Sequence, residues 1–179
     1  MTQSSLDAFI ASVRSSWGPI STELLARCRG ELDDLTAADP SEGWLAGLLA
    51  ERPATRELHR EPRGFMLLAH SEQIGLYRPP HDHGRAWVVY AVQSGALEIG
   101  TYARVEDPDG QRLVRRDTII LRPGAARAYL PGDIHDTRCL TENALVFRFT
   151  ERDLKHEDQV EQRVTRFVER NGAWFAPRP

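Results

Sequence analysis

The sequence predicts an α+β protein, mainly β, in which N-terminal helices pack against a sandwich, jelly roll or barrel of short strands. Apolar residues recur at helical spacing between residues 4 and 51. After Pro53, short runs rich in β-branched and aromatic residues alternate with Gly, Pro and Asp. A chain of 179 residues suits one compact unit, with a helical segment over 1–52 and a barrel with a C-terminal hairpin over 53–179.

Three amphipathic helices are expected in the first segment. Their apolar residues extend over 6–17, 24–32 and 44–49. Ser21 and Thr22 follow Pro19 as capping residues of the second helix, and Asp39-Pro40-Ser41 is expected to open the third. No cluster of reactive side chains lies in these helices, so the chemistry is expected in the barrel.

The strands of the barrel are expected over 65–70, 74–77, 87–93, 97–104, 113–116, 118–121, 126–130, 137–140 and 144–150. Gly, Pro and Asp mark the turns between them. Near the end of the chain, 163–169 and 173–176 flank Asn171-Gly172, a pair that favours a tight hairpin turn. Many short strands with regular turns are typical of a jelly roll or a barrel.

Composition excludes several classes of function. A net charge of -3 gives no basic field for nucleic acid, so nucleic-acid binding is not expected. No run approaches the roughly 20 apolar residues of a membrane span, and the N-terminus lacks a basic, apolar leader, so we expect a cytoplasmic protein without a membrane partner. Cys28 and Cys139 lack the spacing of a zinc knuckle and are interpreted as buried thiols.

Histidine spacing gives the strongest functional signal. His81 and His83, at positions i and i+2 of an extended segment, project to the same side, because side chains alternate along a strand. A third histidine follows in Pro131-Gly132-Asp133-Ile134-His135. Three imidazoles would bind a divalent metal ion and leave positions open for a substrate. The plainer interpretation is that each is a surface histidine or a hydrogen-bonded core histidine.

The residues around these histidines resemble the two motifs of the cupin superfamily. The first motif is a Gly, five residues, His-x-His and a closing Gly, matched here by Gly75, His81, His83 and Gly95, and the segment that ends at His135 is similar to the second. This resemblance implies a double-stranded β-helix, the RmlC-like jelly roll. Many cupins carry a Glu four or five positions after the second His as a fourth ligand, whereas this chain has Trp87 and Val88 there.

The lack of this Glu, together with the motifs His-Asp-His-Gly and Gly-Asp-Ile-His, resembles the cysteine dioxygenase family, which is the thiol dioxygenase branch of the cupins. The resemblance implies Fe(II) held by three histidines, and a thiol and dioxygen as reactants. Thr55-Arg56, followed by Gly64-Phe65, resembles the segment whose Arg binds the substrate carboxylate, which makes Arg56 the candidate for that role. The chain departs from the family where a Ser-x-His-x-Tyr arrangement is usual, because it reads Leu145-Val-Phe147-Arg-Phe149.

These residues define an expected pocket. Aromatic walls are assigned to Trp87, Tyr90, Phe147 and Phe149. Arg85 is a candidate anion-binding residue at the mouth, and Tyr77 is the nearest replacement for the missing hydroxyl. The register is open at this point, because a shift by one residue would turn Arg148 inward and the two Phe side chains outward. Asp82 is expected to point away from the metal, and either to support its ligands or to be exposed to solvent.

The favoured function is therefore a metal-dependent enzyme, a non-haem iron dioxygenase acting on a small thiol or another small carboxylate substrate. Nickel, zinc, copper and manganese also suit imidazole ligands, so the identity of the metal is open. Two alternatives stand beside this one: a cupin that binds metal or a small ligand without turnover, and a metal-dependent isomerase or hydrolase, which would need a general base near the metal. Strand edges could also pair across a homodimer.

Overall fold

The computed structural model describes residues 3–62 and 64–177. Its helices are α1 (Ser5–Ser16), α2 (Thr22–Thr36), α3 (Gly43–Glu51) and α4 (Leu154–Gln159). The first three confirm the expected helices, and Ser21 caps α2 by accepting a hydrogen bond from the Leu24 amide at 3.1 Å. The mostly polar α4 was not predicted. In the described ranges, no helix is both long and apolar enough to cross a membrane.

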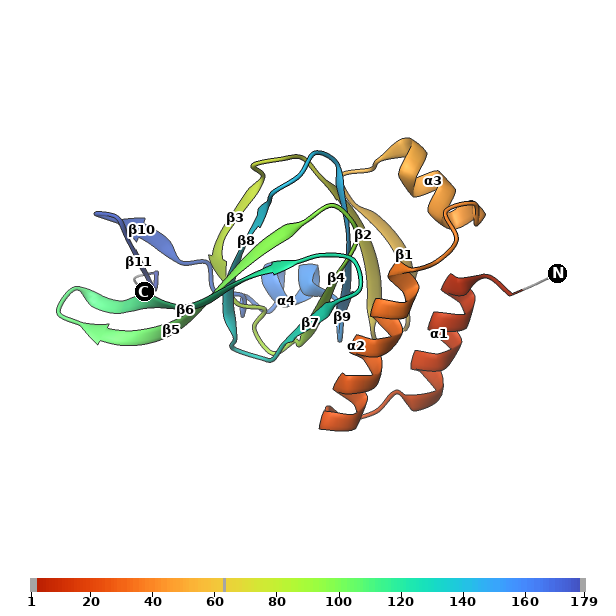
Figure 1. The fold of residues 1–179 in the computed structure, drawn as a ribbon. Coiled ribbons are helices and arrows are strands. Elements are labelled where there is room, and N and C mark those ends of the chain that lie inside the picture. Colours follow the sequence, from red (N-terminus) through yellow and green to blue (C-terminus); the bar gives the residue numbers. More distant parts are fainter. Residues whose placement is uncertain (1–2, 63, 178–179) are drawn as a thin grey trace.

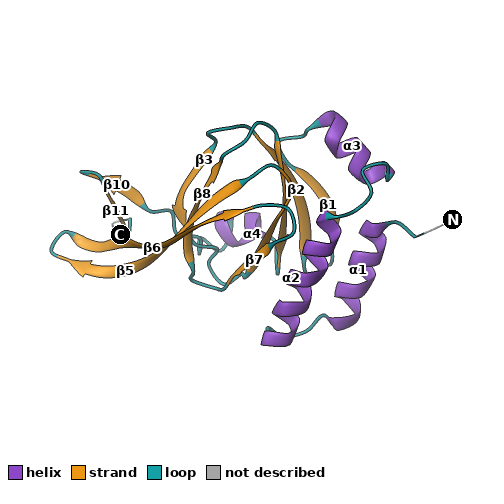
Figure 2. Ribbon diagram, viewed as in Figure 1, coloured by secondary structure: helices purple, strands orange, loops and turns teal. Residues whose placement is uncertain are grey.

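The strands form two antiparallel sheets, which are shown in orange in Figure 2. The five-stranded sheet has the order β1-β2-β9-β4-β7, and the six-stranded sheet has the order β10-β11-β6-β5-β8-β3. The bounds are β1 (Arg56–Arg60), β2 (Met66–Glu72), β3 (Tyr77–His81), β4 (Val88–Ser94), β5 (Leu97–Asp107), β6 (Gly110–Leu121), β7 (Ala126–Tyr129), β8 (Ile134–Cys139), β9 (Ala144–Thr150), β10 (Val168–Arg170) and β11 (Ala173–Phe175).

The path of the chain makes this fold a double-stranded β-helix, as predicted. From β2 to β9 the chain crosses repeatedly from one sheet to the other, remaining in one sheet only for the β5–β6 hairpin. The far end of that hairpin extends beyond the barrel, and β10 and β11 lie beside it (Figure 1). The predicted C-terminal hairpin is present, with the left-handed turn at Asn171 and Gly172.

Several strand boundaries differ from the prediction for local reasons. The strand expected over 74–77 is instead a turn through Gly75, where φ is +81°, and β3 begins at Tyr77. The strands expected over 113–116 and 118–121 form one long strand, β6, which pairs with β5 through a bulge near Thr101. Edge strand β1 was not predicted, because its sequence Arg-Glu-Leu-His-Arg is mostly charged.

The five-stranded sheet has apolar side chains on both faces. Its outer face packs against the helices, which cover it in Figure 1, and Phe9 and Leu32 of the helices contribute to that core. Its inner face packs against the six-stranded sheet, where Val88, Ile99 and Val146 belong to one buried cluster. Adjacent residues of a central strand therefore enter different cores, one under the helices and one inside the barrel.

Candidate metal centre

The three predicted histidines come together inside the barrel. His81 ends β3 and lies directly opposite His135 of β8, while His83 follows in the loop before β4. One possible ligand atom from each residue lies within 4.8 Å of the others. The ring centroids are 5.1 Å apart for His81 and His83, and 4.9 Å apart for each of the pairs with His135. This spacing suits three ligands around one ion.

The nitrogen atoms of the cluster fit a metal ion. The Nδ1 atom of His81 is 2.8 Å from the carbonyl oxygen of Pro79, so it acts as the donor and leaves Nε2 with a free lone pair. His135 is fully buried, and neither of its ring nitrogens has a hydrogen-bond partner among the described residues. A buried polar atom without a partner is costly, and a bound cation would satisfy it.

Electrostatics keep these imidazoles neutral. Burial lowers the pKa of His81, and it holds the pKa values of His83 and His135 well below the ordinary value. The neighbouring imidazoles and the guanidinium of Arg148 lower the pKa values of His83 and His135 further. Because the neutral ring is the form that binds a metal, little proton competition is expected near neutral pH.

Asp82 fixes the loop that carries two of the histidines. Its side chain is 4% exposed, and Oδ1 accepts hydrogen bonds from the amides of Gly84 at 3.1 Å and Thr165 at 2.8 Å. Oδ2 pairs with the guanidinium of Arg104 at 3.1 Å. The loop is thus tied to β5 and to the segment that follows α4, and the expected supporting role of Asp82 agrees with this geometry.

Arg85 has a different environment from the one expected. Its Nε atom donates to Oε1 of Glu157 at 2.9 Å, and its backbone amide donates to the same oxygen at 3.0 Å. The Glu157 side chain is 1% exposed, so this pair anchors α4 against the histidine loop. Gly84 lies beneath the contact with φ of +61°, and a Cβ there would be 3.0 Å from Glu157 Oε1. Arg85 is therefore already neutralised and does not face the cluster as an anion-binding residue.

The expected aromatic walls are corrected by the register of β9. Phe147 and Phe149 lie on the outer face, where they pack with Trp87 in the core beneath the helices. The ring of Phe149 is 6.0 Å from that of Trp17 in the segment after α1. The alternation of β9 was correct, but its faces were assigned the wrong way round, because the apolar helices provide an alternative partner for large apolar side chains.

Arg148 occupies the inner face that had been assigned to the two Phe side chains. It lies opposite Tyr90 of β4, and Tyr90 belongs to the cluster inside the barrel. The Tyr90 hydroxyl is 3.5 Å from Nε2 of His83, so this predicted pocket residue is the one that does reach the histidines. The alternative register considered above is thus the one found.

Arg56 and Tyr77 do not reach the cluster. Arg56 lies opposite Ala69, which faces the helices, and it forms an ion pair with Glu51 at the end of α3. Tyr77 donates its hydroxyl hydrogen to Oδ2 of Asp136 at 2.9 Å. Asp136 follows His135 on β8 and therefore points to the outside of the barrel. Both side chains have partners of their own on other faces.

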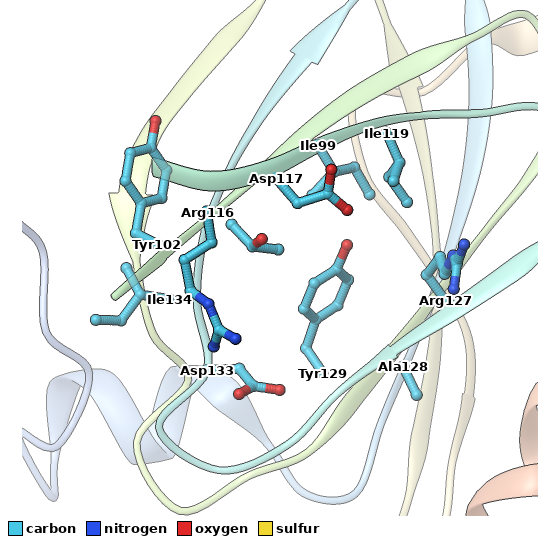
Figure 3. A pocket seen from close by; sticks show the side chains of 11 residues that line it. Ile99, Tyr102, Arg116, Asp117, Ile119, Arg127, Ala128, Tyr129, Asp133 and Ile134 are labelled. Atoms are coloured by element: carbon cyan, nitrogen blue, oxygen red, sulfur yellow. The ribbon is translucent and has the colours of Figure 1, made fainter. Parts of the chain in front are cut away.

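A pocket of about 430 Å³ that the sequence did not reveal opens beside His135. It lies between β5, β6 and the β7–β8 turn, and its wall includes Thr101, which is directly opposite His135. Tyr129 also lines the pocket, with its ring centroid 4.3 Å from that of His135. In Figure 3 the Tyr129 hydroxyl and the Asp117 carboxylate point toward one another inside the pocket. The walls of this pocket come from separate strands, which only the fold brings together.

Comparison with known proteins gives a general likeness only. No family model and no curated protein matches this chain. A structure of KdgF from Halomonas sp. is 20% identical, covering 55% of this chain and 78% of the other, with a TM-score of 0.43. The cupin domain of Schizosaccharomyces pombe Cnp3 is 11% identical, and the match covers 59% of this chain and 68% of the other, with a TM-score of 0.45. A cupin superfamily protein from Desulfitobacterium hafniense is 14% identical, and the match covers 55% of this chain and 76% of the other, with a TM-score of 0.41.

A likeness at this level concerns the general fold alone. Topology and the histidine cluster together define a double-stranded β-helix protein with a candidate centre for a divalent metal ion.

Proposed function

We propose that this protein binds a divalent metal ion through His81, His83 and His135 and acts as a non-haem iron dioxygenase on a small, carboxylate-bearing substrate, with a thiol as the first choice. The observation that carries the proposal is the convergence of three imidazoles, two buried and one half-buried, whose ligand atoms lie within 4.8 Å of one another. Three protein ligands leave coordination positions open, which is typical of a catalytic site and not of a structural one.

The reaction expected for a thiol balances without a further co-reactant. A thiol RSH and dioxygen give the sulfinic acid RSO₂H, which releases its proton to water. Sulfur loses four electrons, dioxygen gains four, and both oxygen atoms form bonds to sulfur. Ferrous iron, when bound, would supply the redox-active centre at which both reactants can meet.

Two tyrosines give the chain its own part in this chemistry. Burial raises the pKa of Tyr90, so its hydroxyl remains protonated and can donate a hydrogen bond to a reactant beside His83. The ring of Tyr129, which is 6% exposed, covers His135 on the side of the pocket and limits access of water. Neither role requires the Ser-His-Tyr arrangement that the sequence lacks.

The test begins with the metal. Protein purified without added metal is analysed for its elements, loaded anaerobically with Fe(II), and given cysteine, 3-mercaptopropionate or mercaptosuccinate in an oxygen electrode. We expect one equivalent of dioxygen per sulfinate, and no uptake by the matched variant H135A. Metal binding without uptake across the panel would exclude the thiol reaction and leave the protein as a binder of metal or small ligands.

A further inference from the structure

The inner face of the five-stranded sheet carries an arginine, Arg148, that forms no ion pair within the described part of the chain. Arg148 lies on the inner face of β9, between Leu68 of β2 and Tyr90 of β4. It forms no ion pair with a carboxylate anywhere in residues 3–62 and 64–177, and its Nε atom is buried without a hydrogen-bond partner. The side chain as a whole is half-buried, but a buried nitrogen without a partner is uncommon, so this arrangement requires an explanation.

The other arginines proposed from the sequence are already neutralised. Arg56 pairs with Glu51, and Arg85 pairs with the buried Glu157. Glu72 is the carboxylate on the inner face of β2, and its Oε1 atom binds Arg78 at 2.5 Å. Among the described residues, Arg148 is therefore the guanidinium beside the histidines that retains its charge for a ligand.

The charge balance of the site favours an anion. Arg148 lies opposite Tyr90, whose hydroxyl is 3.5 Å from Nε2 of His83, so the guanidinium is carried on the face that holds the cluster. A divalent ion on these histidines would add two positive charges beside it. Like charges in a poorly solvated interior repel strongly unless an anion lies between them.

A second orphaned atom indicates that the ligand is polar. His70 lies two residues beyond Leu68 on the same face of β2, and its Nε2 atom is buried without a partner among the described residues, while Nδ1 is 3.0 Å from the Thr55 hydroxyl. A wholly apolar ligand would leave the Arg148 and His70 nitrogens unsatisfied, and it would lose affinity for that reason.

We infer that Arg148 is the anion-recognition residue of this site, and that its ligand is a small bifunctional anion with one donor atom for the metal and a carboxylate for the guanidinium. The inference rests on the metal ion of the proposed function, but not on turnover. With Nε buried, the two terminal nitrogens remain for a carboxylate, which they can bind with two parallel hydrogen bonds. The Tyr90 hydroxyl, beside His83, is placed to contact the same ligand.

The test measures binding in the absence of turnover. Protein loaded with Co(II) under argon is titrated with 3-mercaptopropionate and with 3-mercapto-1-propanol, which has the same donor sulfur without the carboxylate, and the visible cobalt bands are followed. We expect the carboxylate to bind about 10- to 100-fold more tightly in the wild type, since a charge-assisted pair commonly contributes that much. R148Q should remove this preference, and R56Q, on the outer face, should retain it.

Each outcome has one meaning. Equal preference for the carboxylate in R148Q and in wild type, with cobalt bound to both, would overturn the role of Arg148 and leave the metal site intact. Absence of cobalt bands in the wild type would overturn the metal site itself and the bridging ligand with it. If R148Q does not fold, R148K is used, because lysine keeps the positive charge but lacks the two parallel N–H donors of the guanidinium. The preference for the carboxylate over the alcohol should then fall about 10-fold.

Discussion

Tyr129 lies against His135, with the two ring centroids 4.3 Å apart and the ring planes 36° from parallel. The phenol ring is buried, while its hydroxyl points into the pocket of Figure 3. One aromatic ring thus separates a surface pocket from a fully buried histidine that is a candidate metal ligand.

Removing that ring should expose His135. We expect Y129A to lose about 3 kcal/mol of unfolding free energy, because a large buried side chain leaves a cavity. In the metal-free protein, the peptide that contains His135 should react faster with diethyl pyrocarbonate, as measured by mass spectrometry. Y129F keeps the ring and should protect His135 as the wild type does. Equal protection in Y129A would show that another element covers the histidine.

His70 predicts a pH dependence of stability. Burial, aided by Arg148 and Arg78, lowers its pKa to about 3 in the folded protein, whereas an imidazole in an unfolded chain titrates near 6.5. Between these values the unfolded chain binds the extra proton, so this contribution is complete above about pH 6.5 and is lost as the pH falls.

The measurement compares H70Q with the wild type. Unfolding free energies of the metal-free protein are determined by urea titration between about pH 6.5 and 5, above the range where most carboxylates titrate. The slope of stability against pH should be smaller in H70Q by about 1 kcal/mol per pH unit. Identical slopes would mean that His70 is protonated in the folded state at these pH values.

Asp82 should affect metal affinity without touching the metal. Its carboxylate holds the amides of Gly84 and Thr165, so D82A should release the histidine loop and weaken metal binding about 10- to 100-fold. Competition with a chromogenic chelator gives the dissociation constants of Co(II) or Zn(II). D109N, at an exposed turn residue, is the control. An unchanged affinity in D82A would show that the loop is held by other contacts.

Gly84 and Gly132 form a matched pair for testing how closely the loop is packed. Both have positive φ, of +61° and +83°, but a Cβ on Gly84 would be 3.0 Å from Glu157 and Arg163, whereas one on Gly132 meets nothing within 4 Å. Each alanine should cost about 1 kcal/mol for the backbone conformation.

G84A should show a further loss of stability from displacement of α4, and a lower metal affinity than G132A. Thermal unfolding and chelator competition on both variants measure these differences. Equal effects would mean that Glu157 and Arg163 move aside freely and that α4 does not hold the loop.

The spacing of histidines and glycines was sufficient to predict much of the fold and the cluster. The strand period predicted that His81 and His83 share a side; both do reach the cluster, although β3 ends at His81 and Asp82 holds His83 in the loop that follows. His135 was identified by motif, and the register of β3 with β8 then brings it opposite His81.

The faces of β9 could not be predicted in the same way. Either parity of Leu145-Val-Phe147-Arg-Phe149 is consistent with a strand, and the choice depends on where the helices pack, a tertiary property. The helices cover the Phe face, so Arg148 enters the barrel. Trp87, just before β4, and Tyr90 of β4 were assigned to one pocket although their positions have opposite parity, and the structure places them in different cores.

Charge partners were equally inaccessible to the sequence. The sequence does not distinguish Arg56, Arg85 and Arg148 from one another. Only the folded chain shows which of them has a carboxylate beside it. Glu157 lies in α4, which was not predicted, so its contact with Arg85 could not be predicted from the pattern of strands either.

The position of β3 at the end of its sheet links metal content to self-association. Within the six-stranded sheet that strand pairs with β8, and near His81 its other edge is covered by the segment after α4, where the Phe167 amide donates to the Pro80 carbonyl oxygen at 3.0 Å. An ion shared by His81 and His135 would act as a clamp across the β3–β8 seam. Chelation would loosen the seam and make the edge more available to a strand of another molecule. We therefore expect the bound ion to reduce aggregation, and light scattering before and after chelation would measure the difference.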